Sequence, residues 1–415
     1  MTGPSSLRRT PGRAHGFEPL ELEGTIPEGL AGSLYRVAAG IVSAVRIQPA
    51  RACGAVQAIP STGGRIRRLR NNVANSSAWI WNRQLFALME DGKPTQLDPK
   101  TLAPLAERTL DGVVGRTFSA HPHRVASLGT SFNFGLRFAR GTTLDLFALP
   151  DGGQARKIGA IELPWATLVH DFVATATHLV FVICPAKLVL WRALLGIGDI
   201  SQLFEWTPSL GSTLIVVPIA EPERAQPIPC DPYWVWHFAN GFRRADELVF
   251  DLCRYADFSP LDPLRPSSAS PIYHRAVLEL RTGRLRNDPA LDGPAEFPRV
   301  HPAVEGQAHR YAWIHRVQQT ERVARFEVET GRLREWVPDG ALSLSEPVLV
   351  PRPSAGRDEA DVWVLISGHD PLRDRSFVAI LDGHAPDHGP VAKLWFDQTI
   401  PRSFHGSWLD GEPRP

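Results

Sequence analysis

Short runs of β-branched and aromatic residues, each closed by a turn, recur along the whole chain of 415 residues. Examples are LFALMEDG (85–92), ELVFDLCRY (247–255) and DVWVLISG (361–368), whereas long segments with a helical period of apolar residues are rare. Glycine and proline supply the turns, with 34 and 37 residues, and 43% of the chain is hydrophobic. Runs of this kind are typical of strands joined by tight turns. The sequence therefore predicts an all-β fold with a large core.

One turn sequence occurs twice. Thr-Gly-Arg-Leu-Arg stands at residues 282–286 and again at 330–334, an offset of 48 residues. A blade of a β-propeller is a four-stranded sheet of about 40–50 residues, so this offset corresponds to one blade. The repeat favours a β-propeller, and two similar hairpins in a β-sandwich are the alternative.

The charges and cysteines exclude some classes of partner and site. The chain has 45 basic and 44 acidic residues and a formal net charge of +1, so nothing indicates a nucleic acid as a partner. The four cysteines form no Cys-x-x-Cys pair, which argues against a disulfide framework and a thiolate zinc site. A reducing cytoplasm is the expected compartment.

The N-terminus and one apolar segment are the parts of the chain that bear on a membrane or a secretory signal. The N-terminal residues lack the apolar segment of roughly 7–15 residues found in secretory signals, so we expect a flexible tail over 1–16 and a single domain over 17–415. No apolar stretch reaches the roughly 18–20 residues of a membrane span. The apolar segment 187–206 is either a helix packed in the core or an exposed flap at the mouth of a site.

Four of the 14 histidines stand in distinctive contexts. They are His121 in Ser-Ala-His-Pro, His170 in Val-His-Asp-Phe, His237 in His-Phe-Ala-Asn and His405 in Phe-His-Gly-Ser-Trp. Each alone is more often a hydrogen-bonded core residue than a ligand, but their spacing is consistent with one histidine from each of four blades pointing at a common axis. Imidazole nitrogen suits iron, zinc, copper or nickel, so the set predicts a metal site.

These motifs occur in the same order in the carotenoid cleavage oxygenases, which include apocarotenoid and lignostilbene dioxygenases. The chain resembles that family from Gly24 to Trp408, beginning with GTIPEGLAGSLYR (24–36) and continuing through LMEDG (88–92). The resemblance implies a seven-bladed β-propeller with Fe(II) on its central axis. It also implies the iron ligands, which here are His121, His170, His237 and His405.

The family places three glutamates behind its histidine ligands, and the matching residues here are Glu90, Glu296 and Glu346. Outer carboxylates of this kind orient imidazole rings and offset the charge of the metal. In that order, the resemblance pairs the glutamates with His170, His237 and His405, and it leaves His121 without a carboxylate.

Two departures from the family pattern concern access to the metal. Family members have a threonine whose methyl group leans toward a vacant iron position, and here Ser76 stands in its place. Between Gly40 and Ala74 the chain has about half of the residues usual in the family, so we expect one blade to be shortened, with at least one hairpin missing or remodelled over 41–73. Both changes imply wider access to the iron.

The resemblance implies a non-haem Fe(II)-dependent dioxygenase that uses O₂ to cleave one C=C bond of a carotenoid or apocarotenoid into two carbonyl products. No catalytic residue is expected beyond the metal centre, because the redox chemistry belongs to the metal. The expected partners are an apolar conjugated small molecule and, through 187–206, the periphery of a membrane.

Two alternatives stay open. One is a stilbene-cleaving dioxygenase, which is disfavoured because Asn71, Asn72 and Val73 stand where those enzymes carry a lysine. The other is a propeller whose metal site is vestigial and which acts as a binding protein.

Overall fold

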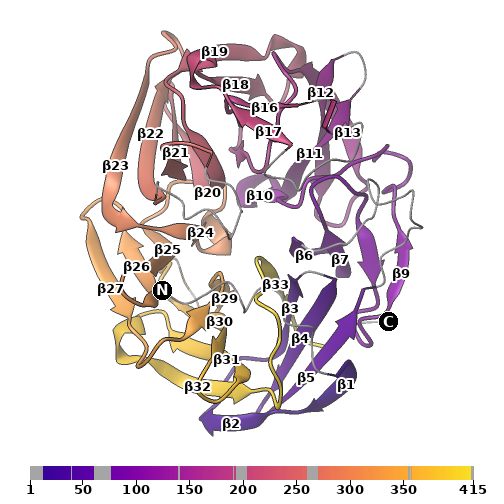
Figure 1. Cartoon of the computed structure of the whole chain (residues 1–415), viewed down its shortest axis with the longest axis vertical. Helices are drawn as coiled ribbons and strands as arrows, with labels where there is room; N and C mark the ends of the chain where they lie inside the picture. The colour runs from indigo at the N-terminus through magenta and orange to yellow at the C-terminus, as the bar shows by residue number, and fades with distance from the viewer. Residues whose placement is uncertain are drawn as a thin grey trace.

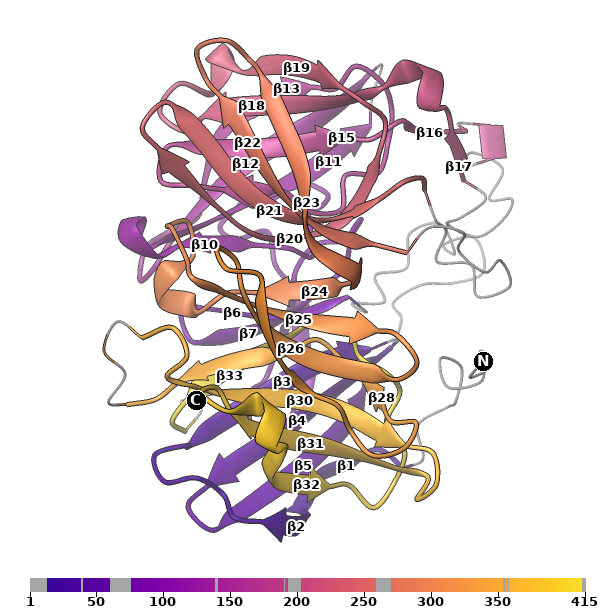
Figure 2. The same cartoon turned by 90° about the vertical axis from the view of Figure 1, so that its left-hand side faces the viewer.

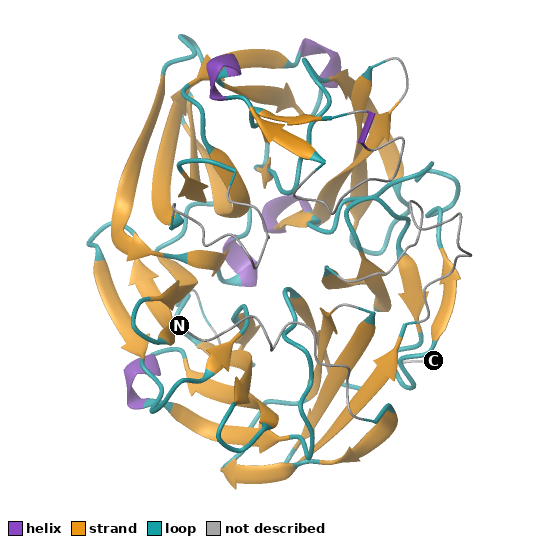
Figure 3. Ribbon diagram, in the orientation of Figure 1, coloured by secondary structure: helices purple, strands orange, loops and turns teal. Residues whose placement is uncertain are grey.

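A computed structural model describes residues 13–38, 40–59, 76–138, 141–189, 191–192, 203–258, 270–353, 356 and 358–412. In this part of the chain, seven antiparallel sheets of at least four strands surround a central axis (Figure 1). Helical structure among the described residues is limited to short turns in the connections (Figure 3). The predicted all-β, seven-bladed β-propeller is confirmed.

Five blades are each built from four strands of one continuous stretch of chain. The first comprises β6 (Ser77–Trp81), β7 (Gln84–Leu88), β8 (Thr95–Leu97) and β9 (Pro104–Glu107). The second comprises β10 (His123–Val125), β11 (Thr130–Phe138), β12 (Thr142–Pro150) and β13 (Arg156–Glu162). The third comprises β14 (Val173–Ala174), β15 (His178–Ile183), β18 (Ser212–Pro218) and β19 (Gln226–Cys230).

The fourth blade comprises β20 (Trp234–Arg244), β21 (Glu247–Tyr255), β22 (Ile272–Glu279) and β23 (Leu285–Pro294). The fifth comprises β24 (Glu296–Arg299), β25 (Tyr311–Val317), β26 (Glu321–Glu327) and β27 (Arg332–Trp336). Single 3₁₀ turns lie in the connections: η3 (Ala126–Leu128), η4 (Pro208–Leu210), η5 (Pro222–Arg224), η6 (Pro302–Val304) and η7 (Pro386–His388).

The last two blades close the ring by combining the two ends of the chain. The sixth contains β28 (Ser343–Leu344), β29 (Val348–Pro351), β30 (Val362–Asp370), β31 (Arg375–Asp382), β32 (Pro390–Trp395) and the N-terminal β2 (Glu21–Gly24). The seventh contains β33 (Gly406–Asp410), β3 (Gly32–Ala38), β4 (Ile41–Gln48), β5 (Arg51–Ala58) and β1 (His15–Pro19). Strand β1 begins inside the tail that we expected over 1–16, of which residues 1–12 lie outside the described chain; the domain boundary stays a prediction.

The repeated turn sequence marks equivalent positions in two successive blades. It joins β22 to β23 and β26 to β27, and its glycines, Gly283 and Gly331, have φ angles of 72° and 73°. In both turns the threonine hydroxyl donates to a glutamate at 2.7 Å, Thr282 to Glu279 and Thr330 to Glu327. Glycine adopts this left-handed backbone without the steric cost that a side chain adds. The repeat therefore reports the blade period, as predicted.

Each blade buries both of its faces, because it is held between two neighbours. In β18, Leu214 and Val216 pack toward the fourth blade, whereas Ile215 and Val217 pack toward the second. A strand covered on both sides reads as a continuous apolar run instead of an alternating one. Each such buried side chain contributes roughly 1.5–3 kcal/mol to stability.

The prediction that a blade lacks a hairpin is wrong over 41–58. The seventh blade has five strands, and β4 and β5 are full strands of eight residues. They are joined by the two-residue turn Pro49-Ala50, in which Ala50 has a φ of 61°. A turn this short fits two strands into a short segment. Residues 60–73, the rest of the segment in question, lie outside the described chain.

The apolar segment 187–206 begins and ends as a β-hairpin instead of a core helix. Strands β16 (Ala186–Leu188) and β17 (Phe204–Trp206) pair with each other at one side of the molecule (Figure 2, right). Trp191 is 56% exposed, and residues 193–202 lie outside the described chain. The core-helix interpretation is therefore wrong for both ends of the segment. No helix described in the structure is long and apolar enough to cross a membrane.

Candidate metal centre

Four histidines meet where the inner strands of four blades approach the axis. His121 and His170 lie just before β10 and β14, His237 lies within β20, and His405 directly precedes β33. Strands β10, β20 and β33 are edge strands on the axial side of their sheets (Figure 1). One nitrogen atom from each ring lies within 4.8 Å of the others. The four histidines predicted as ligands therefore form one cluster.

The ring nitrogens of the cluster face one another. His237 Nε2 lies 3.2 Å from His405 Nε2 and 3.4 Å from His170 Nε2. His121 Nε2 is buried and has no hydrogen-bond partner among the described residues. Four converging imidazole nitrogens, one of them buried without a partner, could hold a cation, which would relieve the cost of the unpaired buried acceptor. The donor set fits a divalent transition metal that prefers nitrogen ligands.

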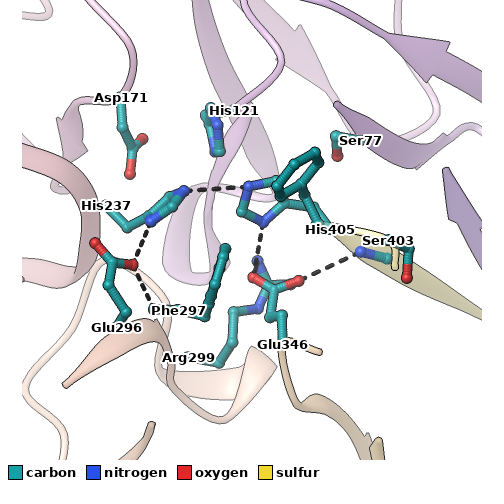
Figure 4. Close-up of polar contacts among 12 residues, drawn as sticks. Ser77, His121, Asp171, His237, Glu296, Phe297, Arg299, Glu346, Ser403 and His405 are labelled. Carbon is teal, nitrogen blue, oxygen red and sulfur yellow. Dashed lines mark hydrogen bonds and ion pairs between the residues drawn. The ribbon is translucent and has the colours of Figure 1, made fainter. Parts of the chain in front are cut away.

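Two of the predicted glutamates hold the outer nitrogen of their histidines by hydrogen bonds. Glu296 Oε2 lies 2.5 Å from His237 Nδ1, and Glu346 Oε1 lies 3.0 Å from His405 Nδ1 (Figure 4). A histidine that donates its Nδ1 proton to a carboxylate presents an unprotonated Nε2. These contacts therefore aim two Nε2 lone pairs at the centre of the cluster.

The third glutamate, Glu90, is placed more loosely. Its Oε1 lies 3.1 Å from His170 Nδ1 but is not aligned for a hydrogen bond, and it lies 4.0 Å from His121 Nε2. The contact with His170 is the expected one, and His121 has no carboxylate within hydrogen-bond distance in the described chain. The roles of these side chains at a metal stay predictions.

Burial and charge keep the cluster suited to a cation. Burial lowers the pKa of His121 well below its ordinary value, and it also lowers the pKa of His405 although Glu346 opposes the effect. Burial acts in the same direction on His237, but the charge and hydrogen bond of Glu296 outweigh it and raise the pKa. For Glu346, burial favours the neutral acid, yet Arg299 and His405 lower the pKa to about 2. The lowered pKa values of His121 and His405 favour neutral rings, and the lowered pKa of Glu346 favours its carboxylate; both suit a divalent cation.

A buried arginine that sequence reasoning missed holds the segment before β33. Arg36 is 2% exposed, and it donates to Ser403 Oγ at 2.6 Å, to the Glu346 carbonyl at 3.0 Å and to the Phe404 carbonyl at 2.8 Å. Its guanidinium thus connects the backbone of Glu346 to the two residues that precede His405. The signal in the sequence was a lone cation within the apolar strand Leu34 to Val37.

Asp171, next to His170, is a second residue whose role the sequence did not reveal. It is buried, and its two oxygens accept the N–H groups of Phe172 at 2.7 Å and Phe238 at 2.8 Å. His123 Nε2 lies 2.6 Å from the same carboxylate. Asp171 therefore ties the segment that carries His170 to the strand that carries His237.

Aromatic rings flank the cluster. The Trp236 ring lies 4.8 Å from the His170 ring, and the Phe297 ring lies 4.9 Å from the His237 ring. The Trp234 ring lies 4.8 Å from the Trp236 ring and 4.6 Å from the Phe258 ring. The Phe258 ring lies 6.1 Å from the ring of Phe204 in the β16–β17 hairpin. An aromatic path thus runs from the cluster to the hairpin. Trp234 and Trp236 are buried in the apolar core between the third and fourth blades, and Phe204 and Phe258 pack against that core.

Ser76 lies beside the cluster through its backbone. Its carbonyl accepts the N–H of His405 at 3.3 Å, and its own N–H donates to the Leu88 carbonyl at 3.1 Å. This places the residue next to one of the four histidines, as the resemblance requires. The effect of its short side chain on access stays a prediction.

Fold and site together define a β-propeller with an all-histidine candidate metal centre. The family model described as Retinal pigment epithelial membrane protein (RPE65) matches residues 47–410 of this chain. The chain belongs to this family, the carotenoid cleavage oxygenases, and the resemblance seen in the sequence is confirmed.

The chain is similar to several characterised proteins. It is 26% identical over 368 residues to the apocarotenoid-15,15'-oxygenase of Synechocystis sp., covering 81% of this chain and 73% of that one. It is 26% identical over 380 residues to an isoeugenol monooxygenase of Pseudomonas nitroreducens, covering 84% and 77% of the two chains. The crystal structure of Pseudomonas brassicacearum lignostilbene dioxygenase matches with a TM-score of 0.89 and 23% identity over 98% of both chains, which shows a common fold.

The three hydrogen bonds of Arg36 predict a large cost for a conservative change. Arg36→Lys keeps the charge but loses the planar fork, so buried acceptors lose their donors and the free energy of unfolding should fall by about 2–4 kcal/mol. Urea denaturation measures this change. The control is Arg83→Lys, since exposed Arg83 also donates to backbone carbonyls, at 3.5 and 3.2 Å. Equal effects of the two substitutions would contradict the assigned role.

Proposed function

We propose that this protein is a non-haem Fe(II)-dependent dioxygenase that cleaves a C=C bond of an apolar conjugated substrate, with carotenoids and apocarotenoids as the leading class. The observation that carries the proposal is the convergence of four histidine nitrogens within 4.8 Å on the axis of the propeller. The names of the relatives, an apocarotenoid oxygenase and an isoeugenol monooxygenase among them, support a cleavage reaction on a conjugated molecule.

The chain's own task is to hold and aim the metal. His121, His170, His237 and His405 would bind the iron. When bound, Fe(II) supplies the redox chemistry that lets O₂ react with an alkene, and side chains cannot supply it. Glu296 and Glu346 keep the Nδ1 protons of their histidines directed outward, so that the Nε2 lone pairs stay available. The cleavage needs no general base, and we assign none.

The aromatic side chains beside the cluster support an apolar substrate. Trp236 and Phe297 stand against two of the histidine rings, so a flat conjugated chain can stack there while water is kept away. These walls favour a polyene over a small polar substrate.

A vestigial site would not explain the polar groups that the core retains. Buried carboxylates and imidazoles are costly unless they are paired, and a binding protein could replace them with apolar residues. Here Glu346 and His405 are both buried and remain hydrogen-bonded to each other. Their retention favours the enzyme over the scaffold.

The proposal predicts substrate-dependent oxygen uptake by iron-loaded protein. With a panel of polyenes and ¹⁸O₂, both carbonyl products should carry the label, because a dioxygenase places one oxygen atom on each fragment. His237→Ala should lose its iron and all uptake, since an open site with four ligands does not readily spare one. Metal analysis, an oxygen electrode and mass spectrometry provide the readouts.

The matched control is His178→Ala. His178 lies on β15 outside the cluster, and its Nδ1 contacts Thr177 Oγ1 at 2.8 Å, so iron and activity should be retained. Zinc in the protein as isolated, with iron unable to produce activity, would sink the proposal. Label in one product alone would instead indicate a monooxygenase.

Ser76 should leave the iron more open than the family's threonine does. A missing methyl group excludes less volume beside the metal and leaves room for water, so part of the O₂ should be consumed without cleavage. Ser76→Thr adds the γ-methyl group and should lower the ratio of oxygen consumed to aldehyde formed. Ser76→Ala lacks that γ-methyl group and should not lower the ratio. An unchanged ratio in Ser76→Thr would refute the occlusion argument.

We propose that the β16–β17 hairpin contacts the cytoplasmic side of a membrane, because a water-insoluble substrate would be dissolved in that membrane. The free thiols of Cys53, Cys184, Cys230 and Cys253 support a reducing compartment, and exposed Trp191 supports interfacial contact. Trp191→Ser should reduce association with neutral liposomes in a flotation assay. The control is Leu105→Ser. Leu105 is 55% exposed, close to the value for Trp191, but it lies on β9 and not in the hairpin. Equal loss in both variants, or none in Trp191→Ser, contradicts the proposal.

A further inference from the structure

Glu296 is held by a third donor that the family resemblance did not assign. Its Oε2 accepts from His237 Nδ1 at 2.5 Å and from the Phe297 N–H at 2.6 Å, while its Oε1 accepts the hydroxyl of Tyr255 at 3.0 Å. We propose that Tyr255 is a positioning residue of the metal centre, whose hydroxyl fixes Glu296 and through it the aim of His237 Nε2. The inference rests on the proposed metal centre.

The position of Tyr255 follows from the register of the fourth blade. Tyr255 is the last residue of β21 and pairs across the sheet with Trp234, three residues before His237 on β20. Glu296 begins β24 in the fifth blade. Tyr255 and His237 therefore both belong to the fourth blade, and the Glu296 carboxylate that they contact belongs to the fifth. This geometry fixes Glu296 from both of its oxygens.

Tyr255 can act only as a donor here. An ionised carboxylate accepts hydrogen bonds and donates none, so the proton of this pair belongs to the tyrosine. Burial, followed by the negative charge of Glu296, raises the pKa of Tyr255 above its ordinary value, which keeps the hydroxyl protonated. The ring also packs against the apolar core between the third and fourth blades. The donor is therefore rigid and always present.

The three glutamates behind the histidines are supported in different ways. Glu346 has a cation near it, with Arg299 Nη1 3.7 Å from its Oε1, and it accepts the Gly406 N–H at 3.3 Å. Glu90 has no hydrogen-bond donor on either oxygen within the described chain. Glu296 alone among these three is held by a neutral side-chain hydroxyl. A neutral donor orients the carboxylate without cancelling its charge, which leaves that charge to act on His237.

The test uses Co(II) as the probe and Tyr255→Phe as the variant, because this change removes the hydroxyl and keeps the ring. Losing one such hydrogen bond should weaken Co(II) affinity by roughly 3–10-fold in chelator competition and should shift the visible spectrum of the bound ion. The matched control is Tyr273→Phe. Tyr273 is buried and donates to a carboxylate, Asp251 Oδ2, at 3.1 Å, but outside the cluster, so affinity and spectrum should stay as in the wild type.

Glu296→Gln separates positioning through the glutamate from a direct effect of the ring. If Tyr255 acts through Glu296, adding Tyr255→Phe to Glu296→Gln should cause little further loss of Co(II) affinity. A full additive loss would overturn the inference, as would a wild-type affinity and spectrum in Tyr255→Phe while Glu296→Gln is weakened. In both cases the wild type still binds Co(II), so the proposed metal centre would stand although the inference about Tyr255 fails. If the wild type binds no Co(II), the proposed centre and the inference fail together.

Discussion

The hydrogen bond from Nδ1 of an axial histidine to a buried carboxylate is the interaction on which the site depends. It selects the tautomer in which Nε2 carries a lone pair, and it fixes the angle of the ring. In the His237–Glu296 and His405–Glu346 pairs, the two partners also come from neighbouring blades. The same bond that aims a nitrogen at the axis therefore ties one blade to the next.

This arrangement requires a closed ring, because four histidines far apart in sequence meet only when the blades complete a circle. The circle is closed by pairing of β3 with β33 and of β2 with β32, which places both ends of the chain in the same two blades. Arg36 of β3 reinforces the closure, since its guanidinium binds the residues around His405. Stability and metal binding are thus coupled at this seam: a change that loosens β3 from β33 also disturbs a candidate ligand.

The sequence predicted the features that repeat or that match a motif. The Thr-Gly-Arg-Leu-Arg turns reported the blade period, because a glycine with positive φ stands at the same place in the fourth and fifth blades. The four histidines and three glutamates could be named through the resemblance, and the structure brings each glutamate to the histidine expected for it.

Other features depend on packing that no local pattern records. Tyr255 and Asp171 became visible only when strand register placed them beside Glu296 and the N–H of Phe238. Within residues 41–58, expecting a missing hairpin was an error of length, since residue counts do not show that the turn at Pro49 and Ala50 is only two residues long. Segment 187–206 was ambiguous because a continuous apolar run suits a helix and a hairpin equally well.

The central claim is that four histidine nitrogens on the axis of this propeller bind iron. X-ray diffraction from crystals of the protein as isolated, collected above and below the iron K edge, tests it most directly. The account predicts one strong anomalous peak above the edge, lost below it, lying between the Nε2 atoms of His170, His237 and His405 and within bonding reach of His121. Two results would contradict the account: no change in the peak across the iron K edge but a new peak above the zinc K edge, or an anomalous peak that lies away from these rings.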